Sequence, residues 1–187
     1  MEGKTRTSLQ NLTKFFGVTG KLKRIPRSGW VEAGVRQPES VADHTFRTSV
    51  LCMIYSNLEG LDELKLLRMA LIHDLPEAII GDLTPSRKTT EIEAKEDTAM
   101  NQILSLLPKK QREKYVAVWN EYKKCETKEA KTVRQLEKLE MVLQAKEYEK
   151  AGSTRQSLKR FIKSAEEAIT SPELRKLLSC ILEEQRK

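Results

Sequence analysis

Histidine is scarce in this chain, since its 187 residues include only His44 and His73. Cysteine is also scarce: three widely spaced residues form no C-x-x-C pair, which argues against a disulfide framework or a cysteine zinc site. Cys52 and Cys180 lie in apolar helical stretches, where we expect them to be small core residues. No apolar run approaches the roughly 20 residues that a membrane span requires, so we expect no contact with a membrane.

An apolar signal segment is missing as well, because residues 1–10 are polar, and we therefore expect a cytoplasmic protein. With 39% hydrophobic and 33% charged residues, the chain has the composition of a globular protein with a well-solvated surface. Its net charge of +7 could serve solubility or attract an anion such as a phosphate, a nucleotide or a nucleic acid. Because acidic and basic residues are interspersed along most of the chain, we do not expect a nucleic-acid partner.

The spacing of apolar residues predicts an all-α fold, and strand-like alternation never persists over more than four residues. Glycine and proline are dense over residues 21–38, which indicates an irregular loop. Asp62, Thr127 and the pair Ser171–Pro172 are typical helix starts. We expect helices at about residues 8–18, 39–58, 63–75, 77–80, 90–107, 108–124, 127–151, 154–168 and 172–185. The length predicts one domain over residues 1–187, with a core of about 8–150 and C-terminal helices (154–187) that pack on it or on a second subunit.

The two histidines have similar surroundings. His73 is followed by Asp74, His44 is preceded by an aspartate, and both lie in apolar stretches. A buried imidazole or ionised carboxylate is costly unless it is paired, and a divalent cation would pair with both. A third segment must add another oxygen ligand. Glu137 and Glu140 are the candidates, because they share one side of a long helix beside an apolar strip.

Each of these residues has an ordinary alternative interpretation. A single histidine in an apolar helix is more often a hydrogen-bonded core or rim residue than a metal ligand. A glutamate on a lysine-rich helix is more often an ion-pair partner one turn away. The concurrence favours a metal site, because both histidines of the chain lie beside an aspartate on separate apolar helices.

The segments around these residues resemble the HD-domain metal-dependent phosphohydrolases, and within them the 5'-deoxynucleotidase branch. The matching segments are KRIPRSGWV (23–31), PESVADH (38–44), HDLPEAIIGD (73–82) and QLEKLEMVLQA (135–145), within a resemblance over about residues 8–150. The resemblance implies an HD-domain helical bundle of about seven to nine helices, a homodimer, and one divalent transition metal ion. Nitrogen and oxygen ligands suit cobalt, manganese and zinc alike, so the ion stays open.

By motif position, the resemblance implies that His44, His73 and Asp74 are metal ligands. The fourth ligand of the family is an aspartate, and the residue at that position here is Glu137. The extra methylene moves the carboxylate by roughly 1.5 Å, whereas metal–ligand distances vary by only about 0.2 Å. The helix could shift back, Glu137 could bind differently, or the site could be weaker.

The resemblance also implies the other functional residues. Glu77 matches the family's acid/base carboxylate, and Asp82 matches a second functional carboxylate, although Asp82 could equally be a turn or cap residue. We expect Arg27 to hold the phosphate by a planar two-point contact, with Arg24 as the alternative. Trp30 could pack on the sugar or base, or anchor its loop.

The expected activity is removal of the 5'-phosphate from (deoxy)nucleoside 5'-monophosphates, with a metal-activated water as the nucleophile. One alternative is an HD-type phosphohydrolase or phosphodiesterase that acts on another nucleotide. The other is a non-catalytic helical binding protein whose metal site has decayed at Glu137. The preferred base and the selectivity for deoxyribose stay open.

Overall fold

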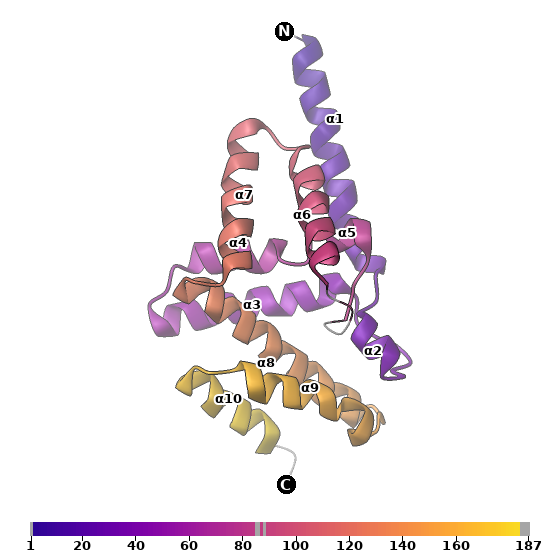
Figure 1. Ribbon diagram of the computed structural model, residues 1–187, viewed down its shortest axis with the longest axis vertical. Helices are drawn as coiled ribbons and strands as arrows, with labels where there is room; N and C mark the ends of the chain where they lie inside the picture. Colours follow the sequence, from indigo (N-terminus) through magenta and orange to yellow (C-terminus); the bar gives the residue numbers. More distant parts are fainter. Residues whose placement is uncertain (1, 85–86, 88, 184–187) are drawn as a thin grey trace.

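The computed structural model describes residues 2–84, 87 and 89–183, with side chains from residue 8 onward. Within these residues the regular structure is helical apart from one isolated bridge, which confirms the predicted all-α fold class. The helices, shown in Figure 1, are α1 (Glu2–Thr19), the 3-10 helix η1 (Gly20–Arg24), α2 (Ser28–Glu32), α3 (Val41–Glu59), α4 (Glu63–Ile72), α5 (Glu77–Ile80), α6 (Thr90–Leu104), α7 (Lys109–Lys124), α8 (Lys128–Lys150), α9 (Arg155–Ala168) and α10 (Pro172–Glu183).

Side-chain caps fix where the site-bearing helices begin. The Ser40 hydroxyl accepts a hydrogen bond from the Asp43 backbone amide, and the Asp43 carboxylate accepts one from the Ser40 amide, which forms a capping box at the start of α3. The predicted caps Asp62 and Thr127 accept backbone hydrogen bonds at the starts of α4 and α8. Gly60, in the left-handed conformation, ends α3. The helix starts follow from local sequence.

The long helix α8 is central to the packing. It contacts α3, α4 and α7 on one side and α9 and α10 on the other, as Figure 1 shows. The main core contains α8 residues such as Val133, Leu136 and Leu139, which are fully or almost fully buried. The C-terminal helices contribute Ala165 and Leu174 to this same core, so they pack on α8.

A short antiparallel bridge closes the base of the loop that precedes α3. The Arg27 amide donates to the Glu39 carbonyl at 3.0 Å, and the Val41 amide donates to the Ile25 carbonyl at 2.9 Å, on either side of the Pro26–Ser40 bridge. The two ends of the loop are therefore held side by side by this bridge, which we call the neck of the loop.

Several expectations were wrong in detail. The segment 21–38, predicted to be irregular, contains η1 and the single-turn helix α2, because weak propensities in so short a segment are overridden by packing. The first helix begins at Glu2 rather than near residue 8, and α4 ends at Ile72 rather than near residue 75. Cys52 is buried as expected, but Cys180, on α10, is exposed. The expected end of the last helix, residues 184–185, lies outside the described residues.

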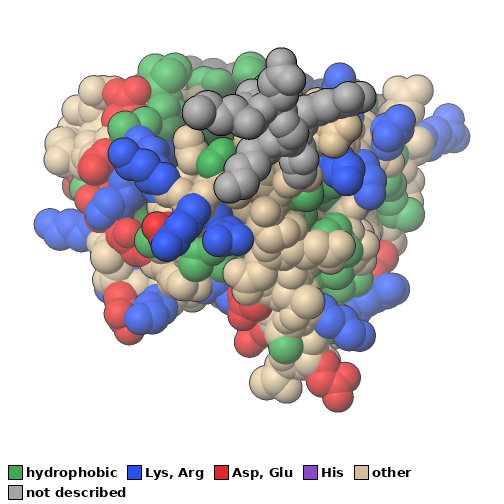
Figure 2. All heavy atoms as spheres, turned by 90° about the horizontal axis from the view of Figure 1, so that it is seen from above, with side chains coloured by type: hydrophobic (Ala, Val, Ile, Leu, Met, Phe, Trp, Pro, Cys, Tyr) green, Lys and Arg blue, Asp and Glu red, His purple; other side chains and the backbone are tan. Residues whose placement is uncertain are grey.

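The described surface is mixed in charge. Figure 2 shows basic and acidic side chains interspersed on one face, with no histidine visible there. Both histidines are buried, with exposed fractions of 2% for His44 and 5% for His73. Among the described helices, none combines the length and the apolar content needed to cross a bilayer.

Candidate metal centre

Three ligand atoms from two segments converge inside the bundle. The Nε2 atoms of His44 and His73 are 3.4 Å apart. The Asp74 Oδ2 atom is 3.2 Å from His73 Nε2 and 3.8 Å from His44 Nε2. The structure therefore brings together the predicted ligands His44, His73 and Asp74, although 29 residues separate the two histidines.

The size of this triangle fits a transition metal ion. A point equidistant from the three atoms lies about 2.0 Å from each, which matches the roughly 2.0–2.2 Å that zinc makes to nitrogen and oxygen ligands. Without a cation or a proton between them, two imidazole lone pairs and a carboxylate oxygen would repel one another at these distances. The donor set of two imidazoles and one carboxylate suits several divalent transition metals.

Hydrogen bonds on the far side of each ring set the correct tautomer. His73 Nδ1 donates to the Ala70 carbonyl at 2.6 Å, and His44 Nδ1 donates to the Glu140 carboxylate at 2.5 Å. Each Nδ1 is therefore the protonated nitrogen when the ring is neutral, and the Nε2 of the neutral ring directs a lone pair into the triangle. Metal-binding histidines in proteins are held in this way by a carbonyl or a carboxylate.

Local sequence explains why these side chains meet. The capping box of α3 places His44 one turn inside that helix, where its side chain faces α8. α4 ends at Ile72, and the turn through Pro76 lets the adjacent His73 and Asp74 approach one point, which residues about 100° apart on a continuous helix could not readily do.

The pKa values of the three side chains also indicate that a positive charge is favoured inside the triangle. Burial lowers the pKa of His44 well below its ordinary value, and the charge of Arg27 adds to this effect. Burial would lower the pKa of His73 too, but the negative charges of Asp74 and Glu137 outweigh it and raise that pKa to about 9. The pKa of Asp74 is lowered, against the effect of burial, by the His73 and Arg27 charges. A proton on His73 thus supplies the positive charge that the triangle needs.

The predicted fourth ligand, Glu137, takes a different position from the other three. It lines the same cleft as Asp74, but it is not part of the group of described ligand atoms that lie within 4.8 Å of one another. Its Oε1 instead accepts a hydrogen bond from the Tyr122 hydroxyl at 2.7 Å. Coordination by Glu137 stays a prediction.

Arg27 joins the other predicted carboxylates beside the triangle. Its Nη1 donates to Asp74 Oδ2 at 3.0 Å and to Asp82 Oδ1 at 2.9 Å, and it lies 3.9 Å from the Glu77 carboxylate. Asp82 Oδ2 also accepts from the Ser28 amide at 2.5 Å, so this carboxylate caps the start of α2 as well. Arg27 is thus already paired with the acidic groups of the site.

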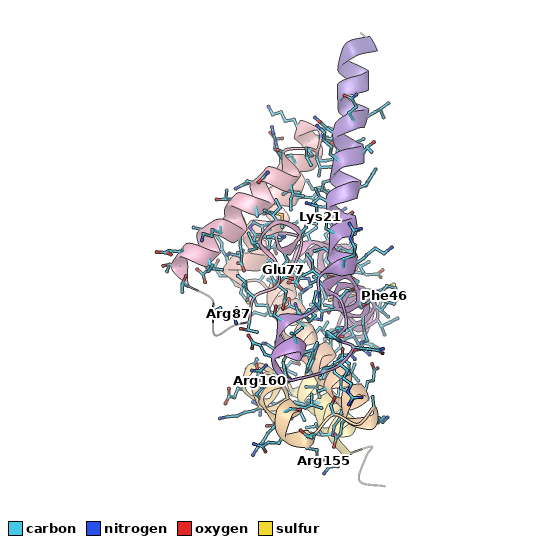
Figure 3. The ribbon with its side chains drawn as sticks, turned by 90° about the vertical axis from the view of Figure 1, so that its right-hand side faces the viewer. Lys21, Phe46, Glu77, Arg87, Arg155 and Arg160 are labelled. Carbon is cyan, nitrogen blue, oxygen red and sulfur yellow. The ribbon has the colours of Figure 1, made fainter. Side chains whose placement is uncertain are left out.

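Glu77 is a buried carboxylate placed to exchange a proton. Burial, together with the negative charges of Asp74 and Asp82, raises its pKa well above the ordinary value. Its Oε2 atom is buried and has no hydrogen-bond partner among the described residues. In Figure 3, Glu77 lies near the middle of the molecule.

Trp30 anchors the loop. It is 2% exposed, its Nε1 donates to Glu39 at 2.9 Å, and its ring packs 3.9 Å from that of Phe161 on α9. It also borders a cleft of about 640 Å³ that leads to Asp74 and Glu77. This volume is within the range of small-molecule sites.

Sequence reasoning missed several residues of the site. Glu140, considered only as an alternative ligand, contacts His44, and Arg47 donates to Glu140 at 3.0 Å. Arg134 stacks over the Tyr122 ring at 4.7 Å and lines the cleft. The sequence spacing could have indicated both arginines. Arg47 follows His44 by three residues, and Arg134 precedes Glu137 by three, so each pair shares a helix face.

The chain belongs to the HD domain family, whose pattern matches residues 19–176. Curated relatives include the mouse 5'-deoxynucleotidase HDDC2, 39% identical over 170 residues that make up 90% of this chain and 85% of the mouse protein. Human 5'-deoxynucleotidase HDDC2 is 38% identical, covering 91% of this chain and 84% of its own. Fission yeast 5'-deoxynucleotidase hdd1 is 32% identical, covering 94% and 90%. These matches confirm the resemblance inferred from the motifs.

Solved structures agree on the fold. A conserved hypothetical protein from Pyrococcus furiosus has a TM-score of 0.75 and 35% identity, covering 90% of this chain and 98% of its own. The PH0347 protein from Pyrococcus horikoshii has a TM-score of 0.77 and 31% identity, covering 90% and 97%. The cyanophage S-2L HD phosphohydrolase DatZ, solved with dA and one catalytic zinc ion, has a TM-score of 0.55 at 18% identity, covering 89% and 93%, and so supports the fold alone.

Proposed function

We propose that this protein is a metal-dependent 5'-deoxynucleotidase that removes the 5'-phosphate from deoxynucleoside monophosphates. The observation that carries the proposal is the triangle of His44, His73 and Asp74, which has the size of a single-ion site. Relatives that cover most of the chain at 38–39% identity are named 5'-deoxynucleotidases, which supports the same activity.

His44, His73 and Asp74 would hold a divalent transition metal ion, with Glu137 as the proposed fourth ligand. When bound, such an ion would supply Lewis-acid activation of the phosphoryl group and of water. Cobalt, manganese and zinc all remain candidates, because each accepts nitrogen and oxygen donors.

Glu77 is the proposed acid/base group. Its raised pKa makes the Glu77 carboxylate a stronger base than an ordinary one, and its buried Oε2 has no hydrogen-bond partner among the described residues, so a substrate or water oxygen can bind there. It can accept a proton from the nucleophilic water and return one to the leaving 5'-oxygen. Arg27, 3.9 Å away, limits the rise of its pKa through a favourable charge.

Arg27 and Asp82 would order the phosphate end of the site. The Nη1 atom of Arg27 fixes Asp74 and Asp82, so a contact to the phosphate is left to its other guanidinium nitrogens. Because acidic groups crowd this end, a phosphate dianion needs further positive charge. Lys131, Arg134 and Lys138, at helical spacing on α8, also line the cleft and would provide this charge.

The apolar end of the cleft would take the nucleoside. Trp30, Met141 and Phe161 line it, although Trp30 is too buried to offer a free face for stacking. We propose that Met141 contacts the base or sugar, and that the rings of Trp30 and Phe161, which is 8% exposed, pack on each other to keep this end of the cleft rigid.

The test is phosphate release from a matched panel of deoxy- and ribonucleoside 5'-monophosphates with cobalt, manganese or zinc added to chelator-treated protein. We expect ion-dependent release, faster from the deoxynucleotides, and a loss of at least about 100-fold in Asp74→Asn. Release from other nucleotides only would favour the broader phosphohydrolase or phosphodiesterase. Ion binding that is absent under all conditions would favour the non-catalytic binding protein.

We also propose that residues 1–187 form one domain.

We further propose that a second copy of the chain covers the outward face of α3. Phe46, Val50, Ile54 and Leu58 recur there every four residues, and Phe46 and Leu58 are 71% and 75% exposed. Phe46 lies at the periphery in Figure 3. Light scattering should give the mass of a dimer, and Phe46→Glu should give a monomer; a monomeric wild type at micromolar concentration would refute this. A cytoplasmic location stays a prediction.

A further inference from the structure

Glu140 is a fully buried carboxylate outside the proposed ligand set, with an exposed fraction of 0%. Both of its oxygens have partners. Oε2 accepts the proton of His44 Nδ1 at 2.5 Å, and Oε1 accepts from Arg47 Nε at 3.0 Å. Burial of a carboxylate is costly, so a position of this kind needs a reason beyond the ordinary charge of a helix surface.

Arg47 is itself held at three points by α8. Besides Glu140, its guanidinium contacts Glu147 at 2.5 Å and the side-chain oxygen of Gln144. The charges that act on Glu140 are therefore Arg47 and the more distant Arg27, against the acidic Glu39 and Glu147. Burial raises the pKa of Glu140 to about 7, and the charge of Arg47 opposes this rise. Because Arg47 occupies Oε1, Oε2 is the oxygen that faces His44 Nδ1.

The structure assigns to Glu140, anchored by Arg47, the role of a positioning residue that holds His44 in its metal-binding tautomer. This inference rests on the proposed function, since it concerns the ion that the hydrolase would hold. Glu140 contacts the nitrogen that faces away from the triangle, and so leaves Nε2 without a proton. The Ala70 carbonyl holds Nδ1 of His73 in the same way. The two imidazoles are thus oriented by different partners, one of them a charged side chain.

A simpler role would be an ion pair that fastens α3 to α8. Such a pair needs Arg47 and Glu140 but not the hydrogen bond to His44. The two roles predict different results when the whole pair is replaced by apolar residues of similar size. This replacement removes the partner of His44 without leaving a buried charge, and exchanges of this kind are often neutral or stabilising.

The experiment compares wild type with the paired variant Arg47→Met/Glu140→Met and with the near-isosteric Glu140→Gln. Glu147→Gln is the control, because it removes one partner of Arg47 and leaves the His44–Glu140 contact intact. Each protein is stripped of ions and checked by circular dichroism and thermal unfolding. Cobalt(II) is then titrated in competition with a chelator, and its visible absorption bands report the ligand set.

We expect the paired variant to bind cobalt about 10- to 100-fold more weakly than wild type, the range seen when such supporting partners are removed. Glu140→Gln should lose about tenfold and show altered cobalt bands, because an amide does not enforce the tautomer. Glu147→Gln should stay within about twofold. Wild-type affinity and wild-type bands in both folded Glu140 variants would overturn the inference.

This outcome is distinguishable from failure of the proposed function. A wild type that binds no cobalt refutes both the hydrolase and the positioning role. A wild type that binds cobalt, with variants that bind equally well, refutes only the role of Glu140. Weaker cobalt binding in the variants, in a protein that releases no phosphate from any nucleotide, supports the positioning role and refutes the nucleotidase.

Discussion

Ion binding should displace a proton from His73. In the ion-free protein the charges of Asp74 and Glu137 overcome the effect of burial and raise the pKa of His73 to about 9. At pH 7 the imidazolium form therefore exceeds the neutral form by roughly 100-fold. A histidine ligand must be neutral, so each ion bound at pH 7 should release about one proton.

The assay is calorimetric titration of cobalt into chelator-treated protein at pH 7, in two buffers that differ in ionisation enthalpy. The difference in the heats gives the number of protons released. The affinity should also rise about tenfold per pH unit between roughly pH 7 and 9 and then level off. Heats independent of the buffer, together with a flat affinity across this range, would refute the reasoning that a proton occupies the place of the ion.

The same pKa predicts how the stability of the ion-free protein depends on pH. Because the folded-state pKa of His73 is above the ordinary 6.5, its stabilising contribution is complete below pH 6.5 and is lost as the pH rises through 9. A shift of this size corresponds to about 3 kcal/mol. Urea unfolding at pH 6 and 9.5 measures the loss, and the difference between wild type and His73→Gln isolates this group from other titrating residues.

Three further predictions concern the ligand set, the helix start and the core. Glu137→Gln should weaken cobalt binding by at least about tenfold if Glu137 is the fourth ligand, whereas unchanged affinity in competition titrations would show that three donors suffice. Ser40→Ala should lower the free energy of unfolding by about 1 kcal/mol, because it breaks the capping box of α3; a urea midpoint equal to wild type would contradict this. Leu104→Ala, at a fully buried site, should cost about 2–5 kcal/mol in urea unfolding while cobalt affinity is retained, and a loss below about 1 kcal/mol would be unexpected.

The parts of the fold that sequence predicted are those set locally. Asp62 and Thr127 cap their helices as expected, because an N-cap hydrogen bond spans only three residues. The convergence of His44 with His73 and Asp74 was also predictable, since both histidines lie beside an aspartate in apolar helices that must bury them. The single turn of α2 was missed, because its glycine and proline surroundings suggest a loop and packing against α9 decides otherwise.

The partners of each carboxylate could not be read from sequence. Glu137 and Glu140 are one turn apart and share a side of α8, so their spacing alone does not say which one meets His44. The rotation of α8 against α3, set by core packing, gives that contact to Glu140 and gives Glu137 to Tyr122. The pairing of Arg27 with Asp82 spans 55 residues and depends on where the loop before α3 folds back.

The bridge between Pro26 and Ser40 has a consequence for how the protein can vary. Arg27 and His44 flank this neck on opposite sides, so their separation is fixed by its hydrogen bonds and not by the loop beyond it. Inserting or removing residues at 34–37 would change the length of the loop without moving the side chain of Arg27 or of His44. The length of this segment can therefore change while the separation of Arg27 and His44 is preserved.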